Sequence, residues 1–198
     1  MNTIIEYIER LSNISKNIRL YQTLDTKIIL KNIGKITGEV DKQYIEFLMN
    51  TNGASILDYC FLGIKNNSLG VNVYDNMREL WSMDNLLTFR FWGIAGTSSG
   101  ESFGYLDEID NAGNHFIGYY TTKEPEQVYL VASSFKIFMI KFLRQIELAL
   151  EIDQNAIYTT NNNWFLDQEK LVIGDDEMAQ YLQNKKTSKY NLLDNRIR

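Results

Sequence analysis

Hydrophobic residues recur at helical spacing in several stretches of the chain. The clearest is predicted to be a helix over residues 133–147, where apolar side chains repeat every three or four positions behind a serine N-cap. One face of this helix must pack against other apolar residues, and we expect that partner to be a sheet. The apolar positions are Phe135, Phe138, Met139, Phe142, Leu143 and Ile146.

The same spacing predicts further helices. The first starts at Thr3, which has capping-box spacing to Glu6, and the second starts at Asp41, an acceptable N-cap. Two more are expected over residues 75–87 and 175–184. Residues 15–37 fit either a short helix or a strand and stay unassigned.

Between the helices, the hydrophobic pattern changes to the alternation that is typical of strands. A hairpin is predicted over residues 54–74, with its turn at Asn66 and Asn67. Four strands with short turns follow, in "TFRFWGIA", "SFGYLDE", "HFIGYYT" and "QVYLVA", which favours an antiparallel meander. The predicted fold class is therefore α+β, with a mostly antiparallel sheet of about six strands packed by N-terminal and C-terminal helices.

The character of the chain changes after about residue 150. We expect residues 1–150 to form one domain and residues 151–198 to be a C-terminal extension, rich in Asn and Asp, whose structure the pattern does not predict. A short strand or turn is expected around Trp164. The extension is predicted to tolerate truncation better than the domain.

Charge and cysteine content narrow the function classes. Twenty Lys and Arg against 25 Asp and Glu give a net charge of −5, so no global field draws the chain to nucleic acid or to an anionic membrane, and a basic protein partner is favoured. Cys60 is the only cysteine, which excludes an intramolecular disulfide framework. It is expected to be a buried, inert thiol. The N-terminus lacks a basic leader and a cleavage site, and no apolar run reaches membrane-spanning length, so a cytoplasmic location is expected.

The sequence offers little catalytic chemistry. "GTSSG" matches the nucleophile-elbow pattern around Ser98, and Asp107 or Asp110 and then His115 follow in triad order. The elbow requires a strand-to-helix turn, whereas a second strand is predicted here, so a Gly/Ser hairpin loop is favoured. His115 is the only histidine, which excludes two-His metal sites, and no motif indicates a cofactor.

The helix-to-strand junction "YIEFLMNTNGASILDYCFLG" resembles the SMI1/KNR4 (SUKH) superfamily, whose hallmark is a "Y..FL...NGG" junction. Three further stretches match in the family's order: "FWGIAGTSSGESFGYL", "VYLVASSF" and "FKIFMIKFL". The resemblance covers roughly residues 1–150. Two departures are that Ala54 stands where a second glycine is common, and that the Leu-Pro often seen before the junction helix is absent, since Pro125 is the only proline.

The resemblance implies an α+β fold and a non-enzymatic, protein-binding role, because many bacterial members are similar to immunity proteins that neutralise toxins, often nucleases. Asn52 and Gly53 match the family junction, and their expected role is structural, closing the helix in the left-handed conformation. Two alternatives stay open. One is a regulatory or scaffold protein of the same fold, and the other is a small serine hydrolase using the "GTSSG" loop.

Residues that contact a protein partner are predicted on the sheet and its turns. Alternation places Arg90 and Trp92 on one face of their strand and Phe89 and Phe91 on the other, and one face is expected to be an aromatic binding surface. Acidic residues on turns beside these strands are expected to steer a basic toxin domain. The predicted contact residues are Arg90, Trp92, Glu101, Asp107, Glu108 and Asp110.

Overall fold

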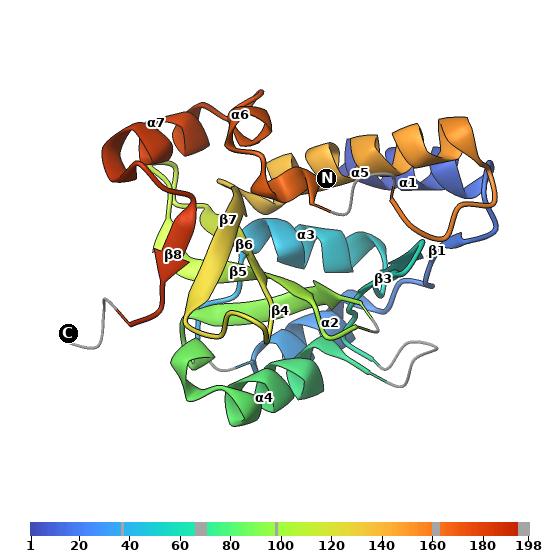
Figure 1. Cartoon of the computed structure of the whole chain (residues 1–198). Coiled ribbons are helices and arrows are strands. Elements are labelled where there is room, and N and C mark those ends of the chain that lie inside the picture. The colour runs from blue at the N-terminus through green and yellow to red at the C-terminus, as the bar shows by residue number, and fades with distance from the viewer. Residues whose placement is uncertain (37, 66–70, 98, 160–162, 194–198) are drawn as a thin grey trace.

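The computed structural model describes residues 1–36, 38–65, 71–97, 99–159 and 163–193. Its centre is an antiparallel sheet of eight strands that lie in the order of the sequence (Figure 1). The predicted α+β class is confirmed, although the sheet has eight strands instead of about six. The strands are β1 (Ile18–Leu20), β2 (Ala54–Ile56), β3 (Tyr59–Phe61), β4 (Phe91–Gly96), β5 (Ser102–Ile109), β6 (His115–Tyr120), β7 (Gln127–Ala132) and β8 (Lys189–Asn191).

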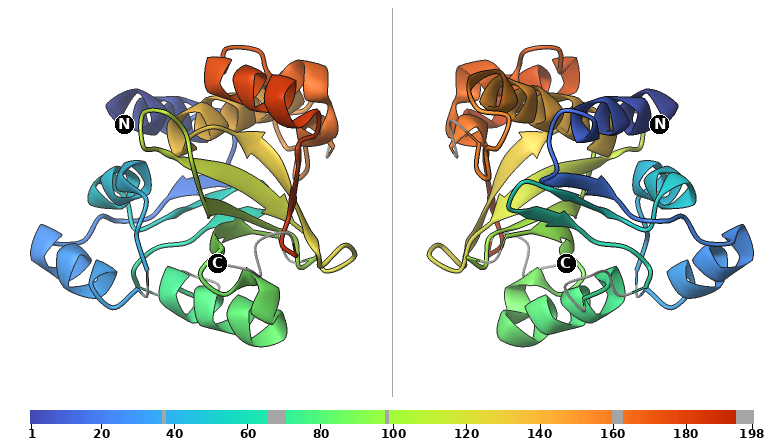
Figure 2. Two further views of the ribbon diagram at one scale, coloured as in Figure 1. Left: turned by 90° about the vertical axis from the view of Figure 1, so that its left-hand side faces the viewer. Right: turned by 90° about the vertical axis from the view of Figure 1, so that its right-hand side faces the viewer.

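Helices lie on both sides of this sheet. Figure 2 shows α1 and α5 side by side above the strands, and α4 below them. None of the helices in the described part of the chain has the length and hydrophobicity needed to cross a bilayer. The helices are α1 (Asn2–Ser12), α2 (Thr26–Ile33), α3 (Lys42–Asn50), α4 (Val73–Met83), α5 (Phe135–Ile152), α6 (Gln168–Leu171) and α7 (Asp176–Lys185), with 3-10 turns η1 (Asn85–Leu87) and η2 (Trp164–Leu166).

The strongest patterns in the sequence correspond to the elements observed. The predicted helices near residue 3, after Asp41, over 75–87 and over 175–184 are confirmed as α1, α3, α4 with η1, and α7, and the four-strand meander is confirmed as β4 to β7. Within the unassigned range, residues 18–20 form β1 and residues 26–33 form α2. Long, regular elements therefore agree with their hydrophobic spacing.

The helix predicted over residues 133–147 is confirmed as α5, which continues to Ile152. Ser134 is its N-cap, and the Ser134 hydroxyl oxygen accepts a hydrogen bond from the Ile137 N–H. All six predicted apolar positions are buried. The ring of Phe138 lies 5.0 Å from the ring of Phe103 on β5, measured between centroids, so the helix packs on the sheet through aromatic contacts.

We predict that Phe138→Ala lowers the free energy of unfolding by about 3–5 kcal/mol, because it removes a fully buried ring and leaves a cavity. Urea denaturation of the purified variant measures this loss. Ile140→Ala is the matched control, since Ile140 is on the same helix but is 48% exposed, and we expect it to cost less than about 0.5 kcal/mol. A loss below about 1 kcal/mol for Phe138→Ala would mean that α5 is not docked in this way.

The predicted hairpin over residues 54–74 is only partly correct. β2 and β3 pair with each other around a turn at Leu57 and Asp58, and Val73 begins α4 instead of belonging to a strand. Asn66 and Asn67, where the turn is predicted, lie outside the described residues. The true turn carries no sequence signal, because Leu57 has a φ of 56°, a conformation that leucine rarely adopts.

A polar contact between distant parts of the chain joins α1 to α5. The Tyr7 hydroxyl donates a hydrogen bond to Glu147 Oε2 at 2.7 Å across a separation of 140 residues, and Arg10 Nη2 donates to Oε1 at 2.7 Å. These donors hold the pKa of Glu147 at about 2. Behind the contact, the apolar stripe of α1 is buried at Ile4 and Ile8, so α1 is part of the core.

Residues 163–193 pack against the sheet. Phe165 of η2 is 2% exposed, and its ring centroid lies 4.3 Å from that of Tyr119 and 5.5 Å from that of Phe103. β8 pairs with β7 as the last strand of the sheet. The predicted turn at Trp164 is therefore a 3-10 turn within the core, and the boundary at residue 150 stays a prediction about independent folding.

A buried polar cluster also holds this C-terminal segment. Asp175 caps α7 by accepting a hydrogen bond from the Met178 N–H, and it accepts two more from Ser133, from N–H at 3.0 Å and from Oγ at 2.6 Å. Lys141 Nζ lies 3.0 Å from Asp175 Oδ2. Burial lowers the pKa of Lys141, and the Asp175 charge opposes that effect, so each group depends on the other.

Candidate functional site

The Asn-Gly pair after α3 forms a structural junction. α3 ends at Asn50, and Thr51 is its C-cap in an extended conformation, so Gly53, with φ of 90°, lies beyond the helix instead of capping it as predicted. Asn52 Oδ1 accepts hydrogen bonds from the N–H groups of Ile64 at 2.9 Å and Lys65 at 3.1 Å. The pair therefore connects the end of α3 to the chain that follows β3.

Arg90 and Asp107 bind the C-terminal strand of the same chain. Arg90 donates hydrogen bonds to the Leu192 backbone oxygen and to the Tyr190 hydroxyl, and the Tyr190 hydroxyl in turn donates to Asp107 Oδ1 at 2.6 Å. The Arg90 guanidinium also lies over the Tyr190 ring, 5.0 Å from its centroid. These two predicted contact residues are thus occupied in holding β8.

Trp92 is not on an open aromatic surface. It is 4% exposed, because its ring stacks on Tyr105 at a centroid distance of 5.2 Å and also contacts Trp81 of α4 at 5.9 Å. The exposed aromatic residue is Phe89, which is 52% exposed, lies before β4 and has a φ of 59°. The prediction that Trp92 belongs to a partly open face is therefore wrong, since helices cover both faces of the sheet here.

The acidic residues of β5 and its turn also contact their own chain. Asp110 Oδ1 accepts hydrogen bonds from the N–H groups of Ala112 and Asn114, so it organises the turn between β5 and β6. Glu108 lies inside β5 and not on a turn, beside Tyr181 of α7, where burial raises the pKa of Tyr181 and the charge of Glu108 raises it further. Asp110 and Glu108 are thus partly exposed and also interact within their own chain.

The serine-hydrolase arrangement finds no support in the fold. The "GTSSG" loop joins two paired antiparallel strands, β4 and β5, and does not lead into a helix. Ser98 lies outside the described residues, and His115 is buried with Nδ1 against the Leu106 backbone oxygen. In the described ranges, no three His, Cys, Asp or Glu side chains come close enough to hold a metal ion.

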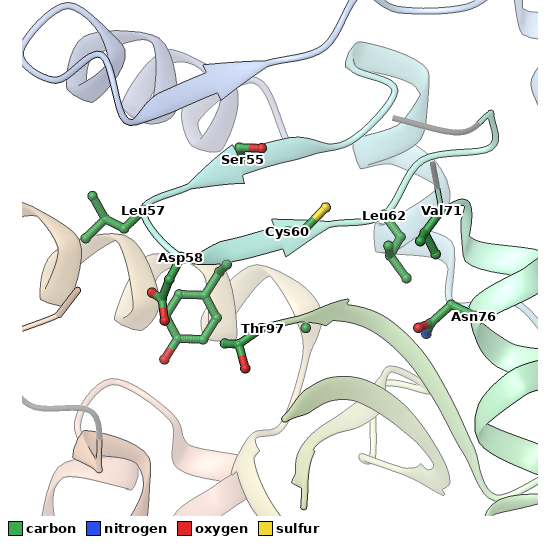
Figure 3. A pocket seen from close by; sticks show the side chains of 10 residues that line it. Ser55, Leu57, Asp58, Cys60, Leu62, Val71, Asn76 and Thr97 are labelled. Carbon is green, nitrogen blue, oxygen red and sulfur yellow. The ribbon is translucent and has the colours of Figure 1, made fainter. Parts of the chain in front are cut away.

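A groove of about 330 Å³ lies over three neighbouring strands, and we call it the β2–β4 groove (Figure 3). Figure 3 shows Ser55 on β2, Cys60 on β3, Thr97 after β4, and Asn76 projecting from α4 toward the strands. The groove is lined by Ser55, Leu57, Asp58, Tyr59, Cys60, Leu62, Val71, Asn76, Gly96 and Thr97.

Small side chains at paired positions create this groove. Ser55 pairs with Cys60, and Cys60 pairs with Gly96, so these three residues form a row across β2, β3 and β4. Side chains alternate between the faces of a sheet, and the next row, which includes Phe61, points instead toward the core beneath α5. A row without large side chains leaves space above the strands that α4 does not fill.

One end of the β2–β4 groove is acidic. Asp58 is at the β2–β3 turn, and its pKa is raised first by burial and further by the charge of Glu101. Glu101 precedes β5, and its backbone oxygen accepts a hydrogen bond from the N–H of Thr97, a groove residue. Glu101 is therefore the predicted contact residue that lies beside the groove.

Sequence reasoning missed the other residues of this groove. No motif distinguishes Ser55, Asp58 or Asn76, and the sequence pattern predicts an inert core thiol at Cys60. Cys60 is indeed buried, at 7% exposed, yet it also lines the groove. The one sequence signal for a groove is that small residues, Ser55, Cys60 and Gly96, occur on three neighbouring strands, on the face opposite Phe61.

Comparison with known protein families matches residues 35–141 to the SMI1 / KNR4 family (SUKH-1), which is more than half of the chain. The match contains every residue that lines the β2–β4 groove. The C-terminal segment with η2, α7 and β8 lies outside it. No curated protein is similar enough to count as a relative.

Proposed function

The chain belongs to the SMI1/KNR4 family (SUKH-1), and from this premise we propose that it is a non-enzymatic protein-binding module that acts as an immunity protein against a bacterial toxin. The observation that carries the proposal is the family match over residues 35–141, which includes the whole groove. The resemblance of the Asn52–Gly53 junction to that of the family supports the same role.

The β2–β4 groove replaces the aromatic face as the proposed contact surface. It combines apolar side chains such as Leu57 and Leu62 with polar groups at its rim, a mixture that suits a protein interface. Glu101 stays in the proposed surface because it adjoins Thr97, and Glu108 stays as a more distant acidic residue. Arg90, Trp92, Asp107 and Asp110 are assigned structural roles instead.

Charge favours a basic toxin domain as the partner. The net charge of −5 speeds association with a positively charged protein, and salt screens that attraction. Nuclease toxins are one class of basic protein that fits this description. Neutralisation then requires only that the bound chain cover the toxin's functional surface.

Co-expression with toxin domains encoded beside the gene tests this function. We expect survival of the host and a co-purifying complex. We also expect Thr97→Trp, which fills the rim of the groove, to weaken binding by about 30-fold, equivalent to about 2 kcal/mol. Thr122→Trp is the matched control, because Thr122 is exposed on the β6–β7 turn, and it should bind as the unmodified chain does.

Two outcomes would contradict parts of the proposal. If no adjacent toxin is bound or neutralised, the immunity role is wrong, and a cellular partner isolated in its place would favour a regulatory or scaffold protein. If Thr97→Trp binds as tightly as Thr122→Trp, the groove is not the contact surface. Isothermal titration calorimetry on the purified proteins measures the affinity of each tryptophan variant for the partner.

A further inference from the structure

One oxygen atom of Asp58 has no hydrogen-bond partner within the described part of the chain. Its Oδ1 has almost no contact with solvent, and no group among the described residues donates a hydrogen bond to it. A buried acceptor without a donor costs free energy, and a charged one costs more. Asp58 lines the β2–β4 groove, so its carboxylate places negative charge at this end of it.

Glu101 adds a second negative charge beside the groove. Its charge contributes to the raised pKa of Asp58 and of Tyr59, both of which line the groove, although burial is the larger cause for each. None of the ion pairs formed within the described ranges involves Asp58 or Glu101. The acidic end of the groove is thus not neutralised by a lysine or arginine of the described chain.

The rest of the groove is suited to a hydrocarbon stem. Leu57, Leu62 and Val71 contribute apolar lining, and the volume of about 330 Å³ is at the lower end of the range for ligand pockets, about 300–1,000 Å³. Lysine and arginine combine an apolar stem with a cationic head, and they bury the first while pairing the second. The groove has room for one such side chain and matches its polarity.

We propose that the β2–β4 groove is the docking site for a basic side chain, lysine or arginine, presented on the surface of the partner protein. The cationic head pairs with the Asp58 carboxylate, and the nearby negative charge of Glu101 adds to the attraction. The apolar stem lies along Leu57 and Leu62. This inference rests on the proposed protein-binding function and narrows the partner to a protein with an exposed basic residue at the centre of its interface.

Cys60 provides a built-in reporter for this proposal, because it is the only cysteine and lines the groove. The unmodified chain is treated with 2-aminoethyl methanethiosulfonate, which carries a lysine-like ammonium group, and separately with the anionic 2-sulfonatoethyl reagent. We expect the ratio of the cationic to the anionic rate to exceed the ratio for 2-mercaptoethanol by about tenfold, since a negative field concentrates cations.

Variants that remove the two negative charges test whether Asp58 and Glu101 cause the preference for the cationic reagent. Asp58→Asn combined with Glu101→Gln is expected to return the ratio to that of 2-mercaptoethanol. Glu6→Gln removes one charge from an exposed position on α1, across the sheet from the groove, and should leave the ratio unchanged. Thermal unfolding followed by circular dichroism verifies that the variants compared are folded.

The proposal is overturned if the ratio equals that of 2-mercaptoethanol, or if the double variant keeps the high ratio. It is also overturned if neither reagent modifies Cys60, because a groove closed to an aminoethyl group is closed to a lysine side chain. The measurement uses no partner protein. Its failure would therefore leave the immunity proposal standing, and failure of toxin binding would leave the charge preference standing.

Discussion

Gly53→Val is expected to lower the free energy of unfolding by more than about 4 kcal/mol, a loss large enough to leave little folded protein. Two effects combine at this residue. Its φ of 90° is a conformation that a β-branched residue adopts only with strain. In addition, a Cβ atom at Gly53 would lie 2.3 Å from the backbone oxygen of Phe61, and backbone cannot move aside as a flexible side chain can.

The crowding arises because two chain segments pass at backbone contact distance. A Cβ at Gly63 would similarly lie 2.2 Å from the backbone oxygen of Asn52. The end of α3 and the end of β3 therefore approach so closely that neither glycine has room for a side chain. The strand pair that forms the groove begins at this point, so the variant disturbs the candidate site as well as the fold.

Gly113→Val is the matched control for strain alone. Gly113 has a φ of 78°, but a Cβ there would have no atom within 4 Å. We expect a loss of about 1–2 kcal/mol from the backbone conformation. Urea denaturation, with soluble yield as a second measure, compares the two variants. Equal losses would show that the backbone contact at Gly53 contributes nothing.

Removing residues 163–198 is expected to give insoluble or non-cooperatively folded protein. The deletion exposes the surface that Phe165 covers and takes away buried Leu171 and Met178, and each such side chain contributes about 1.5–3 kcal/mol. It also removes Asp175 and leaves Lys141 buried without its counterion, a change that costs about 3–5 kcal/mol. The sum is comparable to the whole stability of a typical domain, about 5–15 kcal/mol.

A chain that ends at Leu193 serves as the control, because it keeps every C-terminal residue that the structure describes. We expect it to unfold cooperatively in urea, as the full chain does. If the chain lacking residues 163–198 is equally soluble and cooperative, then the prediction from sequence, that the extension tolerates truncation, is correct and the C-terminal contacts are dispensable.

Long elements were predictable and short ones were not, for a physical reason. α5 repeats its apolar spacing over five turns, so few other structures could satisfy it. β1, β2, β3 and β8 have three residues each, too few to establish alternation. Their positions depend on pairing with longer neighbours, and that information is distributed over the fold.

The candidate site shows a similar limit. Alternation along β4 indicates which side chains share a face, but it cannot tell that Trp81 of α4 and the segment at Gly38 contact the Trp92 ring. The partners of Asp107 include Tyr190, which is 83 residues away in the sequence, so its structural role had no local signal. The groove depends on the register that aligns Ser55, Cys60 and Gly96, and register is a tertiary property.

The hydrogen bond between Tyr7 and Glu147 can form only after a delay during synthesis of the chain. At about 5–20 residues per second, a ribosome needs about 7–28 s to synthesise the 140 residues that separate them. During that interval β1 to β7 can assemble strand by strand, because each strand pairs with its neighbour in sequence. α1, however, lacks its contacts with α5 until then, so a nascent or prematurely terminated chain exposes the α5-facing side of this helix to chaperones and proteases.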